Sequence, residues 1–188
     1  LMMHVEVCGS ITDIAEGEEI RSARFLGDTG YFVTFKETDP LFSVDLSNPA
    51  DPKVLGELKI TGFSSYLHFY GENKLLGVGN EVDPETGAYT GIKLAMFDVS
   101  DPSNVKQLHK FVIKDTYDCP LFYDYKAARS TQKKMFFGFM CDSSYMIFRY
   151  DEEKGFENVF TENLGNSYYG SSYNGTQGIR GCFIDNSF

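Results

Sequence analysis

The segment Val44-Asp45-Leu46-Ser47-Asn48-Pro49-Ala50-Asp51-Pro52-Lys53-Val54-Leu55-Gly56-Glu57-Leu58 sets the architecture of this chain. Its prolines cannot donate to a strand ladder, so they predict a turn between two short strands. The pattern returns 53 residues later as Phe97-Asp98-Val99-Ser100-Asp101-Pro102-Ser103-Asn104-Val105-Lys106-Gln107-Leu108. We expect Asp45 and Asp98, at matching points before the prolines, to cap the two turns through side-chain hydrogen bonds.

The residues around these two copies repeat as well. Arg24-Phe25-Leu26-Gly27-Asp28 and His68-Phe69-Tyr70-Gly71-Glu72 occupy matching places in successive units. Within the first unit, alternating residues and turn signals predict four strands, which we place at 22–26, 31–35, 41–46 and 54–60. A third, more degenerate unit is expected to open on a strand at 121–128. Four strands in a unit of about 50 residues are typical of a β-propeller blade.

The sequence therefore predicts an all-β chain, a partial β-propeller of about three four-stranded antiparallel blades at 20–60, 65–113 and 121–160. Single strands at 3–8 and 179–184 are expected to flank these blades. Three blades are too few to close a ring, which typically takes four to eight. We therefore expect residues 1–188 to be a fragment of one propeller domain. Its open blade edges favour completion by further blades or by self-association of two copies.

Composition narrows the classes of partner. Acidic residues number 27 against 17 basic ones, for a net charge of −10. Nucleic acid would be repelled by this charge, so we expect no nucleic-acid partner. No run of about 18 apolar residues occurs, so we expect no membrane span in these residues.

The four cysteines are far apart in the sequence and form no CxxC pair. Structural zinc sites usually draw their ligands from such close-spaced pairs, so the sequence does not favour one. Buried free thiols are the first expectation, because cysteine is often fully buried. A disulfide between Cys119 and Cys141 is the alternative in an oxidising compartment.

A resemblance rests on residues 21–28, 39–47 and 55–60 and on the two proline turns. Here the chain resembles the secreted bacterial β-propeller domain family that is distantly related to WD-type repeats. The Asp-Leu-Ser-Asn-Pro element also resembles the LVIVP-type repeat of bacterial surface propellers. The resemblance implies a propeller fold, a secreted or cell-surface bacterial protein, and no established enzymatic activity.

One departure from that family concerns a histidine. Where such relatives carry Tyr-Asp-His-Lys-Ala, this chain has Tyr123-Asp124-Tyr125-Lys126-Ala127. Any metal or proton role of that histidine is therefore lost here.

Catalytic signatures are lacking in the sequence. It contains no HExxH, GxSxG, P-loop or GxGxxG pattern, and its histidines are His4, His68 and His109. His68 falls in a predicted inner strand. A hydrogen-bonded structural histidine is the simpler interpretation, and a ligand-binding role for His68 is the alternative.

Acidic residues gather in the loops that a propeller places on one face, namely those between second and third strands and those between blades. Ca²⁺ takes oxygen ligands, so a calcium site is one hypothesis for this face, although no EF-hand spacing occurs. Solvated acids that promote solubility are the simpler interpretation. The candidate metal ligands are Asp39, Asp83, Glu85, Asp115, Asp118 and Asp142.

Tyrosines mark a second candidate binding region, the Gly/Ser/Asn-rich loop at 163–178. Tyr168, Tyr169 and Tyr173 are predicted to stack on a sugar or peptide, because tyrosine combines a rigid apolar face with a polar tip. A linker with aromatic anchors is the alternative.

Two main hypotheses for function follow. The first is a non-enzymatic binding scaffold of an extracytoplasmic bacterial protein that recognises a protein or glycan at the cell surface through its loop face. The alternative is a calcium-dependent polysaccharide-active enzyme that uses acidic loop residues. An enzyme requires convergent carboxylates with one displaced pKa, whereas a scaffold is expected to have solvated acids beside an aromatic patch. A structural module holding neighbouring domains would have two featureless faces.

Overall fold

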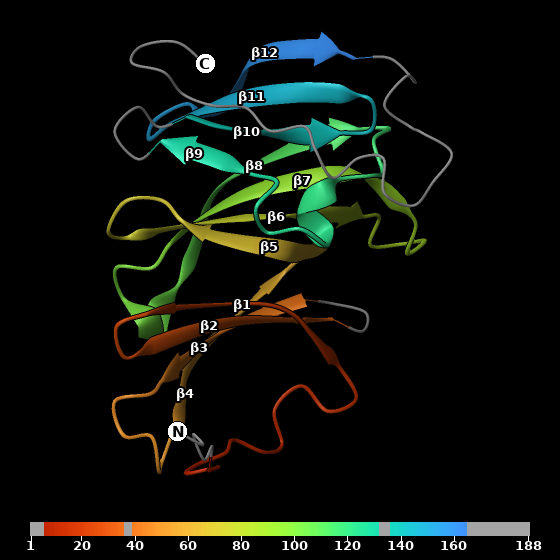
Figure 1. Ribbon diagram of the computed structural model, residues 1–188. Coiled ribbons are helices and arrows are strands. Elements are labelled where there is room, and N and C mark those ends of the chain that lie inside the picture. The colour runs from red at the N-terminus through yellow and green to blue at the C-terminus, as the bar shows by residue number, and fades with distance from the viewer. Residues whose placement is uncertain (1–5, 36–38, 132–135, 165–188) are drawn as a thin grey trace, which may run out of the picture.

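Three four-stranded antiparallel sheets stack side by side in the computed structural model, which describes residues 6–35, 39–131 and 136–164 (Figure 1). The first sheet consists of β1 Glu19–Leu26, β2 Thr29–Phe35, β3 Asp39–Asp45 and β4 Lys53–Ile60. The second consists of β5 Phe63–Phe69, β6 Lys74–Val82, β7 Tyr89–Asp98 and β8 Lys106–Lys114. The third consists of β9 Arg129–Thr131, β10 Phe136–Cys141, β11 Ser144–Asp151 and β12 Gly155–Asn163.

The strands of each sheet lie in chain order, so each sheet is a meander of antiparallel hairpins. The predicted fold class, an all-β chain of three four-stranded antiparallel units, is confirmed. Residues 6–8, the described part of the predicted strand at 3–8, do not form a strand, and 179–184 lie outside the described residues. No helix among the described residues is long and apolar enough to cross a membrane.

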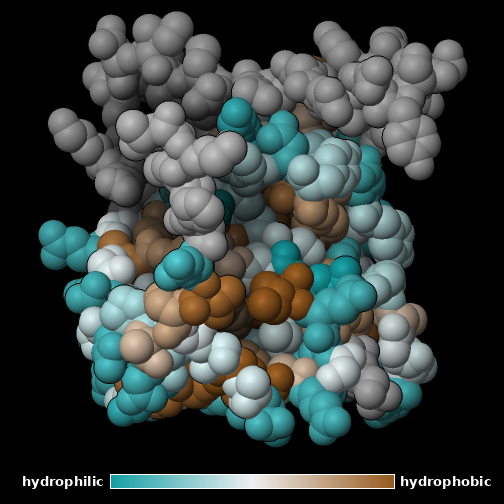
Figure 2. Space-filling view, turned by 60° about the horizontal axis from the view of Figure 1, so that its bottom comes forward, coloured by the Kyte–Doolittle hydropathy of each residue, from teal (hydrophilic) through white to brown (hydrophobic). Residues whose placement is uncertain are grey.

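The outward side of the first sheet carries exposed apolar residues. Figure 2 shows apolar side chains gathered on the face that comes forward, which is the side of this sheet. By the strand register, Phe25 of β1 and Val54 of β4 are exposed apolar residues of this side, whereas the exposed Leu26 faces the other way. The segment before β1 covers part of this side, where its Ile14 and Glu18 line a groove together with Phe42 of β3.

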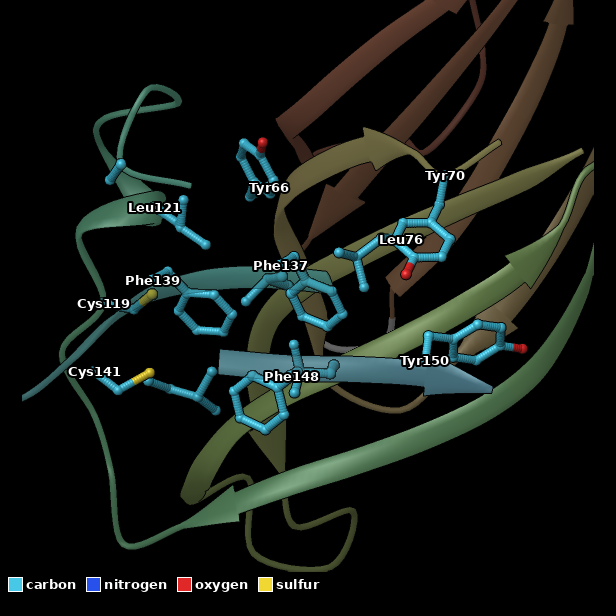
Figure 3. Packing of buried hydrophobic residues seen from close by; sticks show 14 of the residues in the cluster. Tyr66, Tyr70, Leu76, Cys119, Leu121, Phe137, Phe139, Cys141, Phe148 and Tyr150 are labelled. Carbon is cyan, nitrogen blue, oxygen red and sulfur yellow. The ribbon is translucent and has the colours of Figure 1, made fainter. Parts of the chain in front are cut away.

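Two apolar clusters hold the three sheets together. The cluster between the first and second sheets contains Tyr31, Val33, Leu41, Ile60, Leu67, Leu75, Ala95, Phe97 and Val99. Between the second and third sheets, the rings of Phe137, Phe139 and Phe148 stack on one another (Figure 3). Phe148 is fully buried, and its ring centroid lies 5.6 Å from that of Phe137 and 5.7 Å from that of Phe139. The ring centroid of Phe111 on β8 lies 5.6 Å from that of Phe148, and the ring centroid of Tyr70 lies 6.2 Å from that of Phe137, so aromatic packing joins the second sheet to the third.

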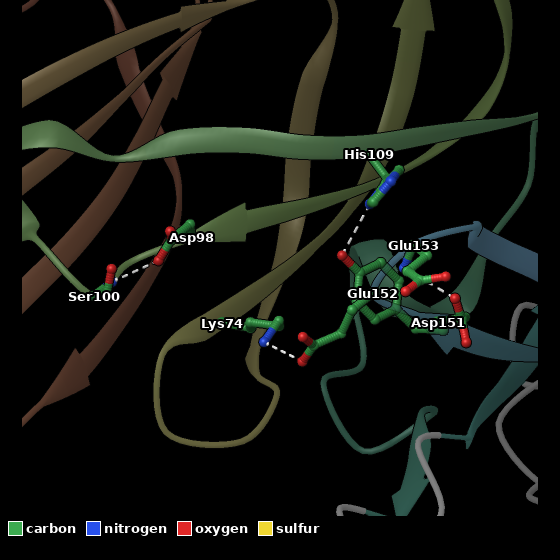
Figure 4. Close-up of polar contacts among 8 residues, drawn as sticks. Lys74, Asp98, Ser100, His109, Asp151, Glu152 and Glu153 are labelled. Carbon is green, nitrogen blue, oxygen red and sulfur yellow. Dashed lines mark hydrogen bonds and ion pairs between the residues drawn. The ribbon is translucent and has the colours of Figure 1, made fainter.

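The predicted turn caps are confirmed. The backbone N–H of Ser47 donates to Asp45 Oδ1 over 2.8 Å, and that of Ser100 donates to Asp98 Oδ1 over 2.9 Å (Figure 4). Hydrogen bonds from the serine side chain first, and then from its backbone, lower the pKa of both carboxyl groups. In the third sheet, where the prolines are missing, Asp151 Oδ1 accepts from two successive backbone N–H groups in the same way. The aspartate is therefore the part of the turn that all three units keep.

The second proline turn also joins two sheets. Its residues 102–104 form the short 3-10 helix η1 (Pro102–Asn104), and the Ser43 hydroxyl of β3 donates to the Pro102 carbonyl. A Cβ added at Gly56 of β4 would lie 3.1 Å from the carbonyl oxygen of Ser103. Glycine at this position thus lets the turn of the second unit lie close to the outer strands of the first.

The predicted strand at 121–128 is wrong. Pro120–Phe122 form a 3-10 helix, η2, and the first strand of the third sheet is the short β9 at 129–131. Pro120 fixes a helical φ, and the N–H of Asp124 then donates to the Pro120 carbonyl over 2.7 Å. Asp124 Oδ1 accepts from the Lys126 N–H, so local hydrogen bonds replace a strand ladder here.

We predict that Phe148→Ala lowers the free energy of unfolding by about 3–5 kcal/mol, because it leaves a cavity between the second and third sheets. Phe160→Ala is the matched control, because the side chain of Phe160 is 46% exposed on β12. Urea unfolding followed by circular dichroism measures both variants. An equal loss of stability in the two would contradict the packing described here.

Candidate functional site

One edge of the sheets gathers the candidate loops. The turns at 83–88 and 142–143 emerge there together with the blade connections at 61–62 and 115–128, and we call this edge the connection face. Hydrogen bonds hold its parts together: the Asp142 N–H donates to the Asp118 carbonyl over 2.8 Å. The Asp115 N–H likewise donates to the Thr90 carbonyl over 3.3 Å.

Two of the predicted metal ligands on this face cap the backbone. Asp83 Oδ1 accepts from the N–H groups of Glu85 and Thr86, each over 2.9 Å, and these hydrogen bonds lower its pKa. Asp142 has a positive φ of 47°. Its Oδ1 accepts from the N–H groups of Tyr117 and Asp118, over 3.3 Å and 2.9 Å. Both carboxylates shape loops, a role that short acidic side chains commonly take.

Asp118 differs from these two. It is half-buried, and its pKa is raised, first by that burial and then by the neighbouring charge of Asp142. Glu85 and Asp115 are exposed, and Asp39 begins β3. Across 6–35, 39–131 and 136–164, no three His, Cys, Asp or Glu side chains come together as a metal site would require. The structure thus brings together Asp118 with Asp142, and Asp83 with Glu85, but not the predicted set as a whole.

Exposed tyrosines lie on the connection face. Tyr117, Tyr123 and Tyr125, all within 115–128, have exposed fractions of 55%, 62% and 64%. The ammonium of Lys126 lies 5.5 Å from the centre of the Tyr125 ring. Sequence reasoning missed Tyr123 and Tyr125 as candidates because it assigned 121–128 to a strand, and it did not single out Tyr117. The tyrosines that it singled out, Tyr168, Tyr169 and Tyr173, lie outside the described residues.

His68 belongs to a polar cluster that spans inner strands. Its Nδ1 lies 3.2 Å from the hydroxyl of Tyr66, and its Nε2 lies 2.8 Å from Oγ of Ser130 on β9. Arg24 of β1 completes the cluster, with its guanidinium 5.5 Å from the centre of the Tyr66 ring. The pKa of His68 is lowered, first by burial and then by the charge of Arg24. Sequence reasoning singled out His68 alone, because nothing in the pattern pairs it with residues on two other blades.

The Ser–His contact lacks the third member of a hydrolase triad. In such triads a carboxylate accepts from the other ring nitrogen of the histidine. Here the Tyr66 hydroxyl takes that place, and of the charged groups in the described part of the chain, Arg24 is the one that acts on His68. The described residues around this contact therefore do not form such a triad.

Cys119 and Cys141 lie side by side between the second and third sheets (Figure 3). Both are free thiols and both are buried, as expected, whereas Cys8 is exposed, contrary to expectation. The pKa of Cys141 is raised, chiefly by burial and then by the hydrogen bond with Cys119. Cys182 lies outside the described residues.

Comparison with known proteins agrees with this architecture. A family model described as "Beta propeller domain" matches residues 1–187. The chain belongs to this β-propeller family. An uncharacterised protein of Methanocaldococcus jannaschii is 39% identical over 150 residues, which are 80% of this chain and 23% of that protein. An uncharacterised protein of Archaeoglobus fulgidus is 41% identical over 133 residues, which are 71% of this chain and 20% of that protein.

The propeller chain thus spans about a fifth of the length of these two relatives. Both are archaeal, whereas the resemblance in the sequence implied a bacterial protein. Among solved structures, a protein from Lactobacillus plantarum is similar with a TM-score of 0.32 and 9% identity, over 72% of this chain and 53% of that one. A structural similarity this low does not contribute to the family assignment.

We predict that iodoacetamide modifies Cys8 of the native protein and leaves Cys119 and Cys141 unmodified until guanidinium unfolds the chain. The thiolate is the reactive form, and burial both hinders access to the pair and disfavours that form at Cys141. Peptide mass spectrometry of native and unfolded samples measures this difference. A Cys119–Cys141 disulfide in protein purified without reductant would contradict it.

We predict that two substitutions on the connection face, Asp118→Asn and Asp83→Asn, change the melting temperature in opposite directions at neutral pH. The pKa of Asp118 is raised in the folded state, so its negative charge destabilises the fold when the pH is above this folded-state pKa. Below the pKa of about 3.9 that an aspartate has in the unfolded chain, the carboxyl is neutral in both states and the effect disappears. Asp118→Asn is therefore expected to raise the melting temperature at pH 7 and to leave it unchanged at pH 3.

Asp83→Asn is the matched control. Its carboxyl has a lowered pKa, so the charge stabilises the fold above the unfolded value and this contribution is lost as the pH falls through the folded value. We expect Asp83→Asn to lower the melting temperature at pH 7. The same sign of change in both variants would contradict the roles described here.

Proposed function

We propose that this propeller chain is a non-enzymatic binding module that recognises a protein or glycan partner through its connection face. The observation that carries this proposal is the exposure of Tyr117, Tyr123 and Tyr125 within one blade connection. Exposed tyrosines offer a large rigid contact area at low entropic cost, which suits recognition of sugars and peptides.

The acids around these tyrosines support a binding role over a catalytic one. Asp83 and Asp142 already accept backbone hydrogen bonds, so their carboxylates are committed to the loops that they shape. Glu85 and Asp115 are exposed to solvent. Solvated acids beside an aromatic patch are the arrangement that a scaffold is expected to have.

The location of the module is part of the proposal. The resemblance to secreted propellers supports an extracytoplasmic protein, with its partner at the cell surface. Self-association is also proposed, because the first sheet leaves Phe25 and Val54 exposed on the face turned away from the second sheet. Apolar side chains of this kind are stabilised when another sheet covers them.

A second candidate function rests on Asp118 and Asp142. Two neighbouring carboxyl groups, one of them with a raised pKa, are also what acid–base catalysis uses. A calcium-dependent enzyme active on polysaccharide therefore stays the alternative proposal. It requires calcium ligands beyond this pair.

Glycan and peptide arrays probed with the labelled chain test the two proposals. We expect Tyr117→Ala combined with Tyr125→Ala to weaken binding at least tenfold, because each tyrosine supplies contact area at the face. Phe160→Ala, which removes an exposed ring from β12, is the control and is expected to bind as the unaltered chain does.

The alternative predicts a different result. Polysaccharide shortened in the presence of Ca²⁺, with the activity lost in Asp118→Asn, would contradict a non-enzymatic module. Equal binding by the double tyrosine variant and the unaltered chain would contradict the connection face as the binding surface.

A further inference from the structure

We propose that Arg24, His68 and Ser130 form a binding site for the carboxylate group of a small ligand. The three residues come from β1, β5 and β9, the first strands of the three sheets, and each is half-buried. The site uses none of the tyrosines of the connection face, so it goes beyond the proposed function and does not depend on it.

Arg24 is the cation of this site. Acidic residues outnumber basic ones in the chain, yet no ion pair between described residues includes Arg24. One of its nitrogens donates a long 3.5 Å hydrogen bond to the Ala23 carbonyl, and the guanidinium lies over the Tyr66 ring. The ring stabilises the cation by a cation–π contact and leaves guanidinium donors for a ligand.

Two other cations of the first and second sheets have carboxylate partners. Arg21, three residues earlier on β1, lies 3.5 Å from Glu19, and Lys74 of β6 lies 2.7 Å from Glu152. These two positive charges are therefore balanced within the chain. Arg24 has no such partner among the described residues, so an anion from outside can balance its charge.

Polar groups next to Arg24 supply the remaining contacts. Ser130 Oγ and the imidazole of His68 lie 2.8 Å apart, and the Tyr66 hydroxyl lies 3.2 Å from the other ring nitrogen. With the imidazole Nε2–H donating to Ser130 Oγ and the Tyr66 hydroxyl donating to Nδ1, the Ser130 O–H is left as a donor for a ligand. Together the guanidinium and this hydroxyl can donate to both oxygens of a carboxylate.

The charge of the site favours a carboxylate over a phosphate. A guanidinium presents its N–H groups as a planar fork, which matches the two oxygens of a carboxylate. The site carries one full positive charge, which balances a monoanion. Burial and the charge of Arg24 lower the pKa of His68, so the imidazole adds no second charge at neutral pH. A phosphate dianion would therefore remain undercompensated.

NMR titration of the isotope-labelled chain at pH 7 tests this site, with sodium acetate and D-galacturonate as the carboxylate probes. D-galactose is the neutral match of galacturonate, and inorganic phosphate is the dianion. We expect acetate or galacturonate to give saturable shifts of the His68 ring signals and galactose to give none.

Substitutions of Arg24 and Arg21 distinguish specific carboxylate binding at this site from nonspecific electrostatic attraction of anions. Arg24→Gln is expected to weaken carboxylate binding about tenfold or more, since it removes a charge-assisted hydrogen bond. Arg24→Lys keeps the charge but loses the fork, so a smaller weakening is expected. Arg21→Gln removes an equal charge from the same strand and is expected to change the affinity less than twofold.

Several results would overturn the proposal. They are an absence of saturable shifts with both carboxylates, phosphate binding that is tighter than either, or an equal effect of Arg21→Gln and Arg24→Gln. Ser130→Ala is the second variant if Arg24 variants fail to fold by circular dichroism, and unchanged binding in it would count against the site. The double variant at Tyr117 and Tyr125 is expected to keep carboxylate binding, which separates this test from that of the connection face.

Discussion

Each four-stranded sheet of this chain has two apolar faces, and the burial of those faces against neighbouring sheets is the constraint on which the structure depends. The second sheet satisfies it on both sides, with Leu75 and Phe97 facing the first sheet and Leu76 and Met96 facing the third. A sheet this small gains little stability alone, because burial of apolar area is the main favourable term in folding. The sheets are therefore stable as a stack, and the repeat in the sequence is the means by which the stack is built.

Much of this fold could be predicted from the sequence, because a repeat reports strand and turn positions directly. Asp45 and Asp98 were recognised as turn caps from their matching places, and the structure has both hydrogen bonds. The same reasoning failed at 121–128, where Leu121, Tyr123 and Tyr125 alternate as in a strand. Pro120 and Asp124 favour local hydrogen bonds instead, and a periodic pattern does not register that competition.

The candidate sites were less predictable than the fold, since they form between units rather than within them. His68 was singled out, but Ser130 lies 62 positions further along the chain and Arg24 lies on another blade. A period of about 50 residues says which positions are equivalent and does not say which side chains meet across two sheets. The calcium hypothesis has the same weakness. The hypothesis was based on the number of acidic residues expected on one face. In the structure, one carboxylate oxygen of Asp83 and one of Asp142 accept hydrogen bonds from backbone N–H groups.

The distribution of charge separates two parts of the molecule that differ in what they can bind. Acids dominate the chain and several lie on the connection face, where bare anions are repelled and neutral or cationic groups can contact the tyrosines. Between the inner strands the local charge is reversed, because no carboxylate of the described residues forms an ion pair with Arg24. A ligand that carries one carboxylate on an otherwise neutral body could therefore contact the inner strands with its charge. The inner strands bring Arg24, His68 and Ser130 together only when three blades stand side by side, so this reversal of charge is a property of the stack and of no single unit.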